Sequence, residues 1–413
     1  MTEHRDVIII GGGLIGLTQA LALAAHGITS HVVDRADPAN MTAAGFDGRT
    51  SAISSSSMKM LTAIGLGDAM AGNGCPIEQI WVSDGLRAGE LDFVPSADDG
   101  FLGQMFENRF LRRTLYEAAM AHDAITLHMP ANIVSKRRDA SGAHIALQDG
   151  NTLSAPLMIV AEGRQSITRD EAGIKIAHWQ YGHSAMVGAI FHDKPHRNVA
   201  YEIFYPSGPF AVLPMLDSED GRHRSAIVWS VDRADSPGYM KLSPRGFAAE
   251  VQKALGAKDG RGGILGPVEL AAPLSTYQLG FHHAASITAE RLVLIGDSAH
   301  GIHPIAGQGL NLGLRDVAAL AEVLVEGMRL GLDFGDSQLL DRYSRWRSVD
   351  TLLVAASTDT LNRLFTIPGR TASAVRRFGM GLVQRTAPAK AFFMAEARGE
   401  SGALPKLLKG ARV

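Results

Sequence analysis

The stretch VIIIGGGLIGLTQALALAAHG, Val7 to Gly27, decides the fold of this chain. Its β-branched start predicts a buried strand, its glycines a tight turn, and its apolar run a helix that ends at Gly27. The next segment, ITSHVVDR, predicts a second strand and so completes the start of a βαβ unit. This pattern is typical of an open parallel sheet covered by helices.

The glycines of this stretch are spaced Gly11-x-Gly13-x-x-Gly16. The first permits the turn, the second lets a pyrophosphate approach the backbone, and the third lets the helix pack closely on its strand. The helix N-terminus would attract the phosphate charge. Asp34 ends the second strand, where it can accept hydrogen bonds from ribose hydroxyls. The motif predicts a dinucleotide cofactor without choosing between FAD and NAD.

A second glycine-rich loop follows the strand RLVLIGD, far along the chain. The strand delivers Gly296 and Asp297 to its carboxyl end, where ligands of open α/β sheets bind. Asp297 can accept from a polyol hydroxyl. Beyond it, Pro304 restricts the loop, while Gly307 and Gly309 leave backbone amides uncovered at the start of a helix. Such amides and the helix dipole would stabilise negative charge on a flat ring system.

The α/β pattern brackets a stretch that reads as successive strands, from about Ser184 to Arg233. We therefore expect an α/β fold in which a Rossmann-like dinucleotide domain with the GxGxxG motif is interrupted by an antiparallel β-sheet substrate domain. The first comprises residues 1–75, 105–180 and 278–335, and the second residues 76–104 and 181–277. Residues 336–413 are expected to form a helical C-terminal region.

Composition restricts the class of protein. The 413 residues are 46% hydrophobic and 20% charged, with a formal net charge of -2, which excludes a mainly disordered chain and disfavours a nucleic-acid binder. The single cysteine, Cys75, cannot form an internal disulfide or a CxxC metal site and is expected to be a buried hydrophobe. The uncharged run from Val7 to Ala25 contains three consecutive glycines after Asp6, which argues against a signal peptide or a spanning helix.

The C-terminal part from Arg363 to Val413 has a charge opposite to that of the rest, with ten Lys and Arg residues against two Glu. The segments AVRRFGMGLVQR and AKAFFMAEAR mix apolar and basic positions. One interpretation is a helix that lies on an anionic membrane surface. The other is a helix that packs over the body of the protein with its arginines in solvent. The sequence leaves both open.

Several conspicuous residues have ordinary structural interpretations. His282, His283, His300 and His303 lack a carboxylate or Cys at ligand spacing on a helix, so a metal site there is disfavoured. Asp316 is expected to cap or pair within its own helix. The apolar residues of the predicted sheet are expected to form plain sheet core, and those facing the cofactor to line an apolar substrate cavity; they are Met186, Phe204, Phe210 and Met215.

The segment HPIAGQGLNLGLRD, His303 to Asp316, resembles the signature of the FAD-dependent hydroxylases of ubiquinone biosynthesis (UbiH-like). These belong to the flavoprotein monooxygenases similar to p-hydroxybenzoate hydroxylase. Further similar segments are VIIIGGGLIGL near the N-terminus, TSAISSSS after Arg49, ENRFLRRTL from Glu107 to Leu115, and GPFAVLPM from Gly208 to Met215. The likeness spans most of the chain, and the β-rich insert is matched loosely.

The resemblance implies FAD in the first domain, with His303 and Pro304 near the flavin ring and no residue named as a general base. The family's middle motif pairs Asp with Gly, and here Glu162 stands in place of the Asp, before Gly163. The residues that the resemblance places around FAD are Gly11, Gly13, Gly16, Asp34, Arg49, Arg112, Glu162, Gly163, Gly296, Asp297, Pro304, Gly307, Gln308, Gly309, Leu310 and Asn311.

The implied reaction is hydroxylation of the aromatic ring of a polyprenylated phenol, with NAD(P)H and O2, through a flavin C4a-hydroperoxide. Three alternatives share the motifs: a monooxygenase of a small soluble aromatic, a flavin reductase for prenyl lipids, and a non-catalytic flavoprotein subunit of a quinone-synthesis complex. A prenyl tail would account for a cationic amphipathic C-terminus. We expect a cytoplasmic enzyme, with peripheral attachment to the inner face of the membrane as the open interpretation of that C-terminus.

Overall fold

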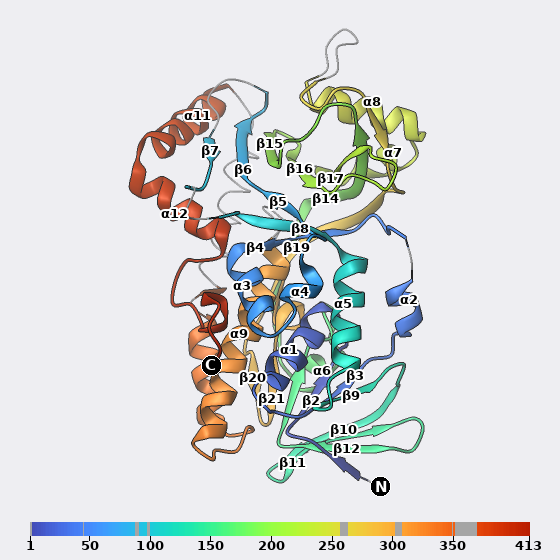
Figure 1. Ribbon diagram of the computed structural model, residues 1–413, viewed down its shortest axis with the longest axis vertical. Coiled ribbons are helices and arrows are strands. Elements are labelled where there is room, and N and C mark those ends of the chain that lie inside the picture. Colours follow the sequence, from blue (N-terminus) through green and yellow to red (C-terminus); the bar gives the residue numbers. More distant parts are fainter. Residues whose placement is uncertain are drawn as a thin grey trace.

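The computed structural model describes residues 2–43, 45–86, 91–96, 100–256, 263–301, 308–348, 350–351 and 370–413. Figure 1 shows an α/β part with a large sheet stacked on it, and α11 and α12 beside that sheet. The predicted architecture, an α/β part with a β-sheet layer and C-terminal helices, is confirmed. Three residues of the predicted flavin loop, His303, Pro304 and Gly307, lie outside the described residues.

The α/β part is built on a six-stranded sheet in the order β20-β21-β13-β2-β3-β9. Five of its strands run parallel, and β20 is antiparallel to β21. All residues of β2 and β13 are buried, because a parallel sheet is covered on both faces and its strands are correspondingly apolar. The strands are β2 (Val7–Ile10), β3 (Ser30–Val33), β9 (Ile125–His128), β13 (Leu157–Val160), β20 (Thr288–Ala289) and β21 (Leu292–Leu294).

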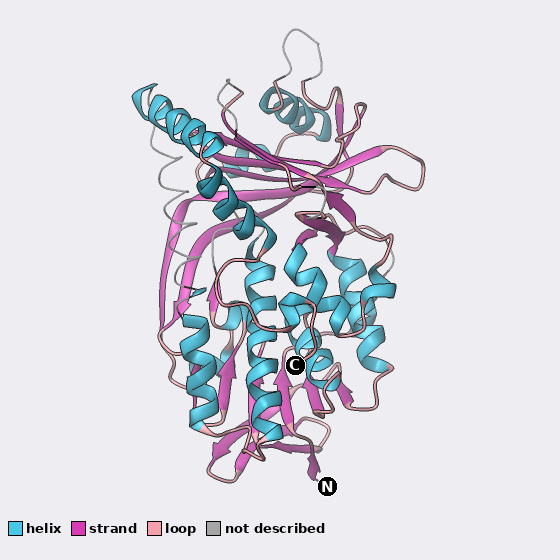
Figure 2. Cartoon of the chain, turned by 60° about the vertical axis from the view of Figure 1, so that its left-hand side comes forward, coloured by secondary structure: helices cyan, strands magenta, loops and turns pink. Residues whose placement is uncertain are grey.

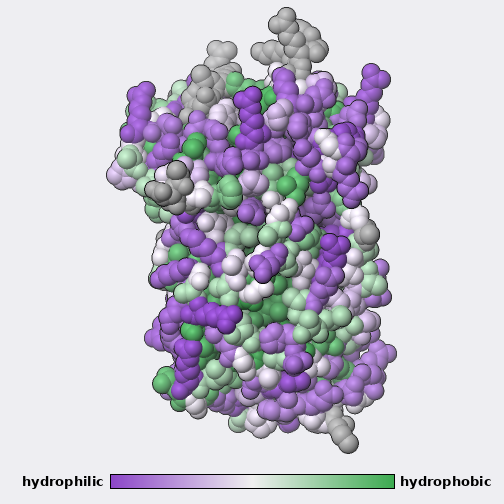
Figure 3. All heavy atoms as spheres, in the orientation of Figure 1, coloured by the Kyte–Doolittle hydropathy of each residue, from purple (hydrophilic) through white to green (hydrophobic). Residues whose placement is uncertain are grey.

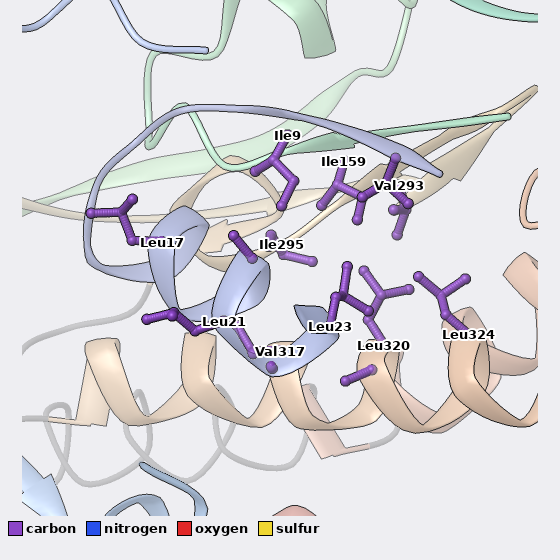
Figure 4. Packing of buried hydrophobic residues seen from close by; sticks show 14 of the residues in the cluster. Ile9, Leu17, Leu21, Leu23, Ile159, Val293, Ile295, Val317, Leu320 and Leu324 are labelled. Carbon is purple, nitrogen blue, oxygen red and sulfur yellow. The ribbon is translucent and has the colours of Figure 1, made fainter. Parts of the chain in front are cut away.

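Two helices that are far apart in the sequence cover one face of this sheet. They are α1 (Leu14–Ala24) and α9 (Gln308–Arg329). Figure 4 shows side chains of both helices pointing toward Ile9, Ile159 and Val293 of the sheet. The other face packs against a smaller sheet of order β1-β12-β11-β10, whose apolar residues join the same core. Its strands are β1 (Thr2–His4), β10 (Ile133–Asp139), β11 (Gly142–Leu147) and β12 (Thr152–Ala155).

The second part is a large, mostly antiparallel sheet in the order β22-β19-β14-β17-β16-β15-β6-β7, with β18 paired to β14. Figure 2 shows its long strands curving over the end of the α/β part. The strands are β6 (Gln79–Asp84), β7 (Leu91–Phe93), β14 (Ile176–His192), β15 (Val199–Tyr205), β16 (Gly208–Met215), β17 (His223–Asp232), β18 (Val268–Leu270), β19 (Ser275–Ala284) and β22 (His300–Gly301).

The two faces of the large sheet contribute to two separate apolar clusters. Met186 and Phe210 pack with α8, whereas Phe204 and Met215 pack in the cluster shared with β5, β8 and α11. All four are buried, as expected of sheet core. The division into two domains remains a prediction, and two long strands, β14 and β19, run across its boundaries at 180/181 and 277/278.

A three-stranded sheet, in the order β4-β8-β5, lies between the two parts. Its strands are β4 (Thr50–Ser54), β5 (Cys75–Ile77) and β8 (Gly103–Glu107). The remaining helices are α2 (Pro38–Thr42), α3 (Ser55–Ala63), α4 (Gly67–Met70), α5 (Asn108–Met120), α6 (Ile167–Glu171), α7 (Ser236–Met240), α8 (Pro244–Ala254), α11 (Arg370–Arg385) and α12 (Ala387–Arg398), with short 3-10 helices η1 (Gly296–Ser298) and η3 (Leu407–Lys409). Residues 337–348 are also helical.

Candidate cofactor site

Four adjacent parallel strands carry the predicted cofactor residues at their carboxyl ends. In the sheet order β21-β13-β2-β3, the strands are followed by Gly296, Glu162, Gly11 and Asp34 respectively. Because the carboxyl ends of parallel strands meet at one edge, segments nearly 300 residues apart in sequence are brought together. At this edge, β3 lies on one side of β2 and β13 on the other, so the connections leave in opposite directions. Ligands of such sheets bind at this kind of point.

The glycine turn has the steric properties that its spacing predicts. Gly11 has a φ of +108°, and a Cβ there would lie 2.4 Å from the carbonyl oxygen of Ala161. A Cβ on Gly16 would lie 1.8 Å from the carbonyl oxygen of Gly11. A Cβ on Gly13 would meet no described atom within 4 Å, and no side chain caps α1 at this residue. The first and third glycines therefore serve packing, and the second leaves backbone open at a helix N-terminus, as a pyrophosphate requires.

Asp34 is held beside this turn. Its Oδ2 accepts a hydrogen bond from the amide of Gly12 at 2.6 Å, and its Oδ1 accepts from the amide of Ala36 at 2.7 Å. The side chain is only partly buried, and each carboxylate oxygen can accept further bonds. The carboxylate is thus oriented by backbone amides while it can still accept from ribose hydroxyls.

Glu162, which stands where the family has Asp, is turned back on its own loop. Its Oε2 accepts from Oγ of Ser166 at 2.6 Å and from the amide of Thr168 at 3.0 Å, and its Oε1 accepts from Oγ1 of Thr168 at 3.0 Å. The longer carboxylate is accommodated as an anchor for the start of α6. Gly163 has a φ of +83°, and its amide donates to Oγ of Ser298 at 3.1 Å, which joins this loop to η1.

Asp297 lies at the rim of the site. Its Oδ2 accepts from Nε of Arg164 at 3.1 Å, and both side chains are nearly half exposed. Its carbonyl oxygen lies 2.8 Å from Nε2 of His282. Gly296 precedes it with a φ of +59°. A contact of Asp297 with a bound ribityl chain stays a prediction, and such a contact would compete with the ion pair to Arg164.

Two arginines that were predicted separately are brought together by a third residue. Arg49 donates to Oδ2 of Asp47 at 2.8 Å, and NH1 of Arg112, on α5, lies 3.6 Å from the same oxygen. Burial opposes ionisation of Asp47, but hydrogen bonds and charge from Arg49, with the charge of Arg112, keep its pKa below the ordinary value. Asp47 was not predicted from the sequence, because its contact with Arg112 depends on how α5 packs beside it.

The start of α9 contains the last of the predicted residues. Asn311 accepts from the amide of Ser54 at 2.9 Å through Oδ1 and donates to the carbonyl oxygen of Ala52 at 2.8 Å through Nδ2. Its amide side chain therefore holds β4 against α9. Leu310 packs partly buried against the α/β core. Gln308 and Gly309 form the first turn of α9.

A buried ionic cluster formed by Asp316, His300 and Arg347 was not predicted from the sequence. Asp316 was expected to cap or pair within its own helix, and this was wrong. Its Oδ2 lies 2.6 Å from Nε2 of His300 and accepts from the amide of Gly296 at 2.8 Å. Its Oδ1 accepts from Nε of Arg347 at 2.7 Å. Arg347 and Arg315 both pair with Asp350 as well. The partners lie in other segments, so sequence periodicity could not reveal them. His300 and His282 thus have protein partners.

Comparison with known proteins decides the family. Residues 4–355, most of the chain, match the model of the FAD binding domain family. The chain belongs to this family. FAD is therefore its cofactor, the chain is an FAD-dependent enzyme of the monooxygenase type, and NAD(P)H is the co-substrate of this type. The open backbone at Gly13 and the tightly packed Gly11 and Gly16 fit FAD in steric terms.

Relatives extend this assignment over nearly the whole chain. The ubiquinone hydroxylase UbiL of Rhodospirillum rubrum is 42% identical over 98% of this chain and 92% of its own length. The 3-demethoxyubiquinol 3-hydroxylase of Escherichia coli is 32% identical over 86% of this chain and 89% of its own. The crystal structure of p-nitrophenol 4-monooxygenase PnpA from Pseudomonas putida has the same fold, with a TM-score of 0.77, 17% identity, and coverage of 97% of this chain and 100% of that one.

Proposed function

We propose that this protein hydroxylates the aromatic ring of a polyprenylated phenol in ubiquinone biosynthesis, using FAD, NAD(P)H and O2. The observation that carries the proposal is the 42% identity to a ubiquinone hydroxylase over nearly the full length of both chains. A second relative, named a 3-demethoxyubiquinol 3-hydroxylase, matches over 89% of its own length. The substrate class comes from these names, because a fold alone does not determine a reaction.

In this proposal, the glycine turn at Gly11 to Gly16 holds the pyrophosphate of FAD, and Asp34 holds the adenosine ribose. Arg49 and Arg112 supply positive charge near the pyrophosphate, balanced by Asp47. When bound, FAD supplies the redox chemistry by which one atom of O2 reaches the ring. The chain's own contribution is to bind, orient and exclude water.

The large sheet would form the substrate side of the site. The cluster that contains Phe204 and Met215 also includes residues of β5 and β8, so an apolar layer lies between the large sheet and the small sheet adjoining the α/β part. An apolar layer suits an aromatic ring with a prenyl tail, since burial of apolar surface is favourable. We propose the two-domain division given above on the same basis.

The function is tested by deletion of the gene and mass spectrometry of the quinones that the cells contain. A prenylphenol that lacks one ring hydroxyl group should accumulate. Expression of the wild-type protein should restore the quinone, whereas expression of Gly13→Asp should not. An intact quinone pool with no new precursor would remove the ubiquinone assignment. Assays of the purified enzyme separate the alternatives. Rapid turnover of water-soluble phenols would favour a monooxygenase of a small soluble aromatic, and turnover without oxygen would favour a flavin reductase. If NAD(P)H did not reduce the FAD with any phenol, a non-catalytic flavoprotein would be favoured.

We also propose that the enzyme is cytoplasmic and attaches peripherally to the inner face of the membrane through α11 and α12. Val375, Phe378 and Leu382 lie at positions i, i+3 and i+7 of α11 and are 61%, 76% and 58% exposed. Phe392 of α12 is 57% exposed. Such spacing places the three α11 residues on one helix face, as in a helix that lies in a membrane interface. None of the helices in the described ranges is long and apolar enough to cross a membrane.

The charges of these helices favour an anionic surface. Arg377, Arg385 and Lys390 are at least partly exposed and form no ion pair with the described part of the chain. Arg376, in contrast, is buried against Asp84, and the other face of α11 packs on the large sheet. The two interpretations of the tail therefore apply to opposite faces of one helix. Figure 3 shows hydrophilic and hydrophobic residues mixed where α11 lies in Figure 1.

Co-sedimentation of the holoenzyme with vesicles tests this attachment. Binding is expected with phosphatidylglycerol-containing vesicles and should be weak with pure phosphatidylcholine. The pair Phe378→Ser and Leu382→Ser should reduce it at least about tenfold, since two large apolar side chains are removed from the interface. Leu330→Ser is the matched control, because Leu330 is 75% exposed elsewhere on the surface. Equal binding by all three proteins would contradict the proposal.

A further inference from the structure

Two histidines and a glutamate meet on the face of the central sheet that packs against the smaller sheet. His31 lies in β3, His128 in the neighbouring β9, and Glu3 in β1 of the smaller sheet. One potential ligand atom from each lies within 4.8 Å of the others. Nδ1 of His31 and Nε2 of His128 are 3.0 Å apart. The cluster is unrelated to the histidines weighed in the sequence, because its members come from three distant segments.

His31 has an unusual environment for a histidine. Its side chain is fully buried, and its Nε2 has no hydrogen-bond partner in the part of the chain that the structure describes. The nitrogen on the other side of the ring, Nδ1, is the one that shares a hydrogen bond with Nε2 of His128. Burial, and then the positive charge that His128 would carry, lower the pKa of His31 to about 4, and burial also lowers the pKa of His128.

Glu3 is oriented toward the two rings by its strand. In the parallel pairing of β1 with β12, Glu3 is in register with Leu153, which is buried in the α/β core. Residues in register on adjacent strands point to the same face, so the Glu3 carboxylate emerges on the side of the central sheet. The residue is exposed, and its side chain can move the short distance that remains.

We propose that Glu3, His31 and His128 bind a divalent metal of the zinc type. Zinc bonds of about 2.0 to 2.2 Å to histidine nitrogen and carboxylate oxygen, in tetrahedral geometry, require ligand atoms about 3.4 Å apart. The two nitrogens already approximate this separation, and Glu3 supplies the third ligand and a negative charge, with water as the fourth. Imidazole and carboxylate ligands together suit zinc better than magnesium or calcium.

The metal would fasten the N-terminal strand to the central sheet. It joins β1 to β3 and β9, and His31 lies three residues before Asp34 on the strand that ends at the cofactor site. This role is independent of the substrate proposed above. Arg5 works against it, since its guanidinium acts on His31 electrostatically and donates to Oγ1 of Thr126 at 3.0 Å. Removal of that charge should therefore strengthen metal binding.

Zinc binding by the full-length holoenzyme tests the proposal. After EDTA treatment and dialysis, ZnCl2 is titrated by calorimetry, retained zinc is measured by mass spectrometry of the metal, and the unfolding temperature is followed with ZnCl2 and with EDTA. Wild type should retain one zinc per chain and unfold at a higher temperature with zinc. Glu3→Gln and His128→Gln should bind at least about 100-fold more weakly. Arg5→Gln should bind more tightly.

His4→Asn is the matched control, because His4 is adjacent and exposed, and its Nδ1 lies near Oγ of Ser154. It should bind zinc as wild type does. If His128→Gln proves unstable, the exposed Glu3→Gln together with Arg5→Gln still decides the matter through opposite shifts in affinity. Wild type that binds no zinc, or Glu3→Gln that binds it as tightly as wild type, would overturn the proposal while leaving the hydroxylase proposal untouched.

Discussion

Asp316 in α9 and Arg347 in the helical segment 337–348 form an ion pair that is almost completely buried, with Nε of Arg347 donating to Oδ1 of Asp316 over 2.7 Å. The same carboxylate accepts from the amide of Gly296, beside the predicted ribityl contact. Burial opposes ionisation of Asp316, but His300 and Arg347 lower its pKa. The pair therefore links the C-terminal region to the turn that carries Asp297.

Removal of Arg347 should leave the buried carboxylate of Asp316 without its arginine partner. We expect Arg347→Met to lower the free energy of unfolding by about 3 to 5 kcal/mol, measured by urea titration. Arg345→Met, at an exposed position two residues away, should change it by less than about 0.5 kcal/mol. A similar small effect of both substitutions would show that the buried pair is not needed for stability.

The two kinds of glycine in the turn should respond differently to an added methyl group. Gly16→Ala brings a Cβ within 1.8 Å of a carbonyl oxygen, so it should destabilise the apoprotein by about 1 to 3 kcal/mol or more. Gly13→Ala meets no described atom and should leave apoprotein stability nearly unchanged, but weaken FAD binding at least about tenfold, or about 1.4 kcal/mol. Thermal unfolding without FAD and flavin fluorescence titration measure the two effects. Equal FAD affinity of Gly13→Ala and wild type would place the pyrophosphate elsewhere.

Glu202 should make the protein less stable at alkaline pH. It lies in β15 and is almost fully buried, and burial raises its pKa to about 7. Because the folded pKa exceeds the unfolded value, the stability associated with the protonated form is present below about pH 4.5 and is lost as pH rises through 7. Glu202→Gln should therefore stabilise the protein at pH 8, by up to about 3 kcal/mol, and have little effect at pH 4.5.

Unfolding temperatures at the two pH values measure this difference. Glu117→Gln, at an exposed position of α5, is the control and should show no pH-dependent difference from wild type. The interpretation would be wrong if Glu202→Gln changed stability equally at both pH values, because such a change would report packing and not ionisation.

The clamp between Arg376 and Asp84 should determine how firmly α11 is held. Nε and NH2 of Arg376 donate to Oδ1 of Asp84 at 3.1 and 3.0 Å, and Ser373 also bonds to this carboxylate. Arg376→Ala should leave Asp84 buried without its cation, and α11 should open more often. Hydrogen exchange across 373–398 should become at least about tenfold faster, whereas Arg377→Ala should leave it unchanged. Unaltered exchange in Arg376→Ala would show that apolar packing alone holds the helix.

The amino-acid sequence alone was sufficient to predict the structural elements that depend on residues close together in the chain. Gly11, Gly13 and Gly16 predicted strand, turn and helix correctly, because the steric demands of a βα turn act over a few consecutive residues. Asp34 was found at the end of its strand for the same reason. The family signature from His303 to Asp316 was equally local. How these residues contact FAD stays a prediction, as does the contact of Glu162, whose carboxylate anchors its own loop.

Tertiary structure decided which distant side chains became partners. Arg376 and Arg377 are adjacent residues of the same type. Arg376 is nevertheless buried against Asp84, whereas Arg377 is partly exposed. Asp316 contacts Arg347, 31 residues away in sequence, and His31 contacts His128, 97 residues away. Periodicity carries no information on such pairs, because a charge buried by packing is stable only beside a partner that the folded chain brings to it.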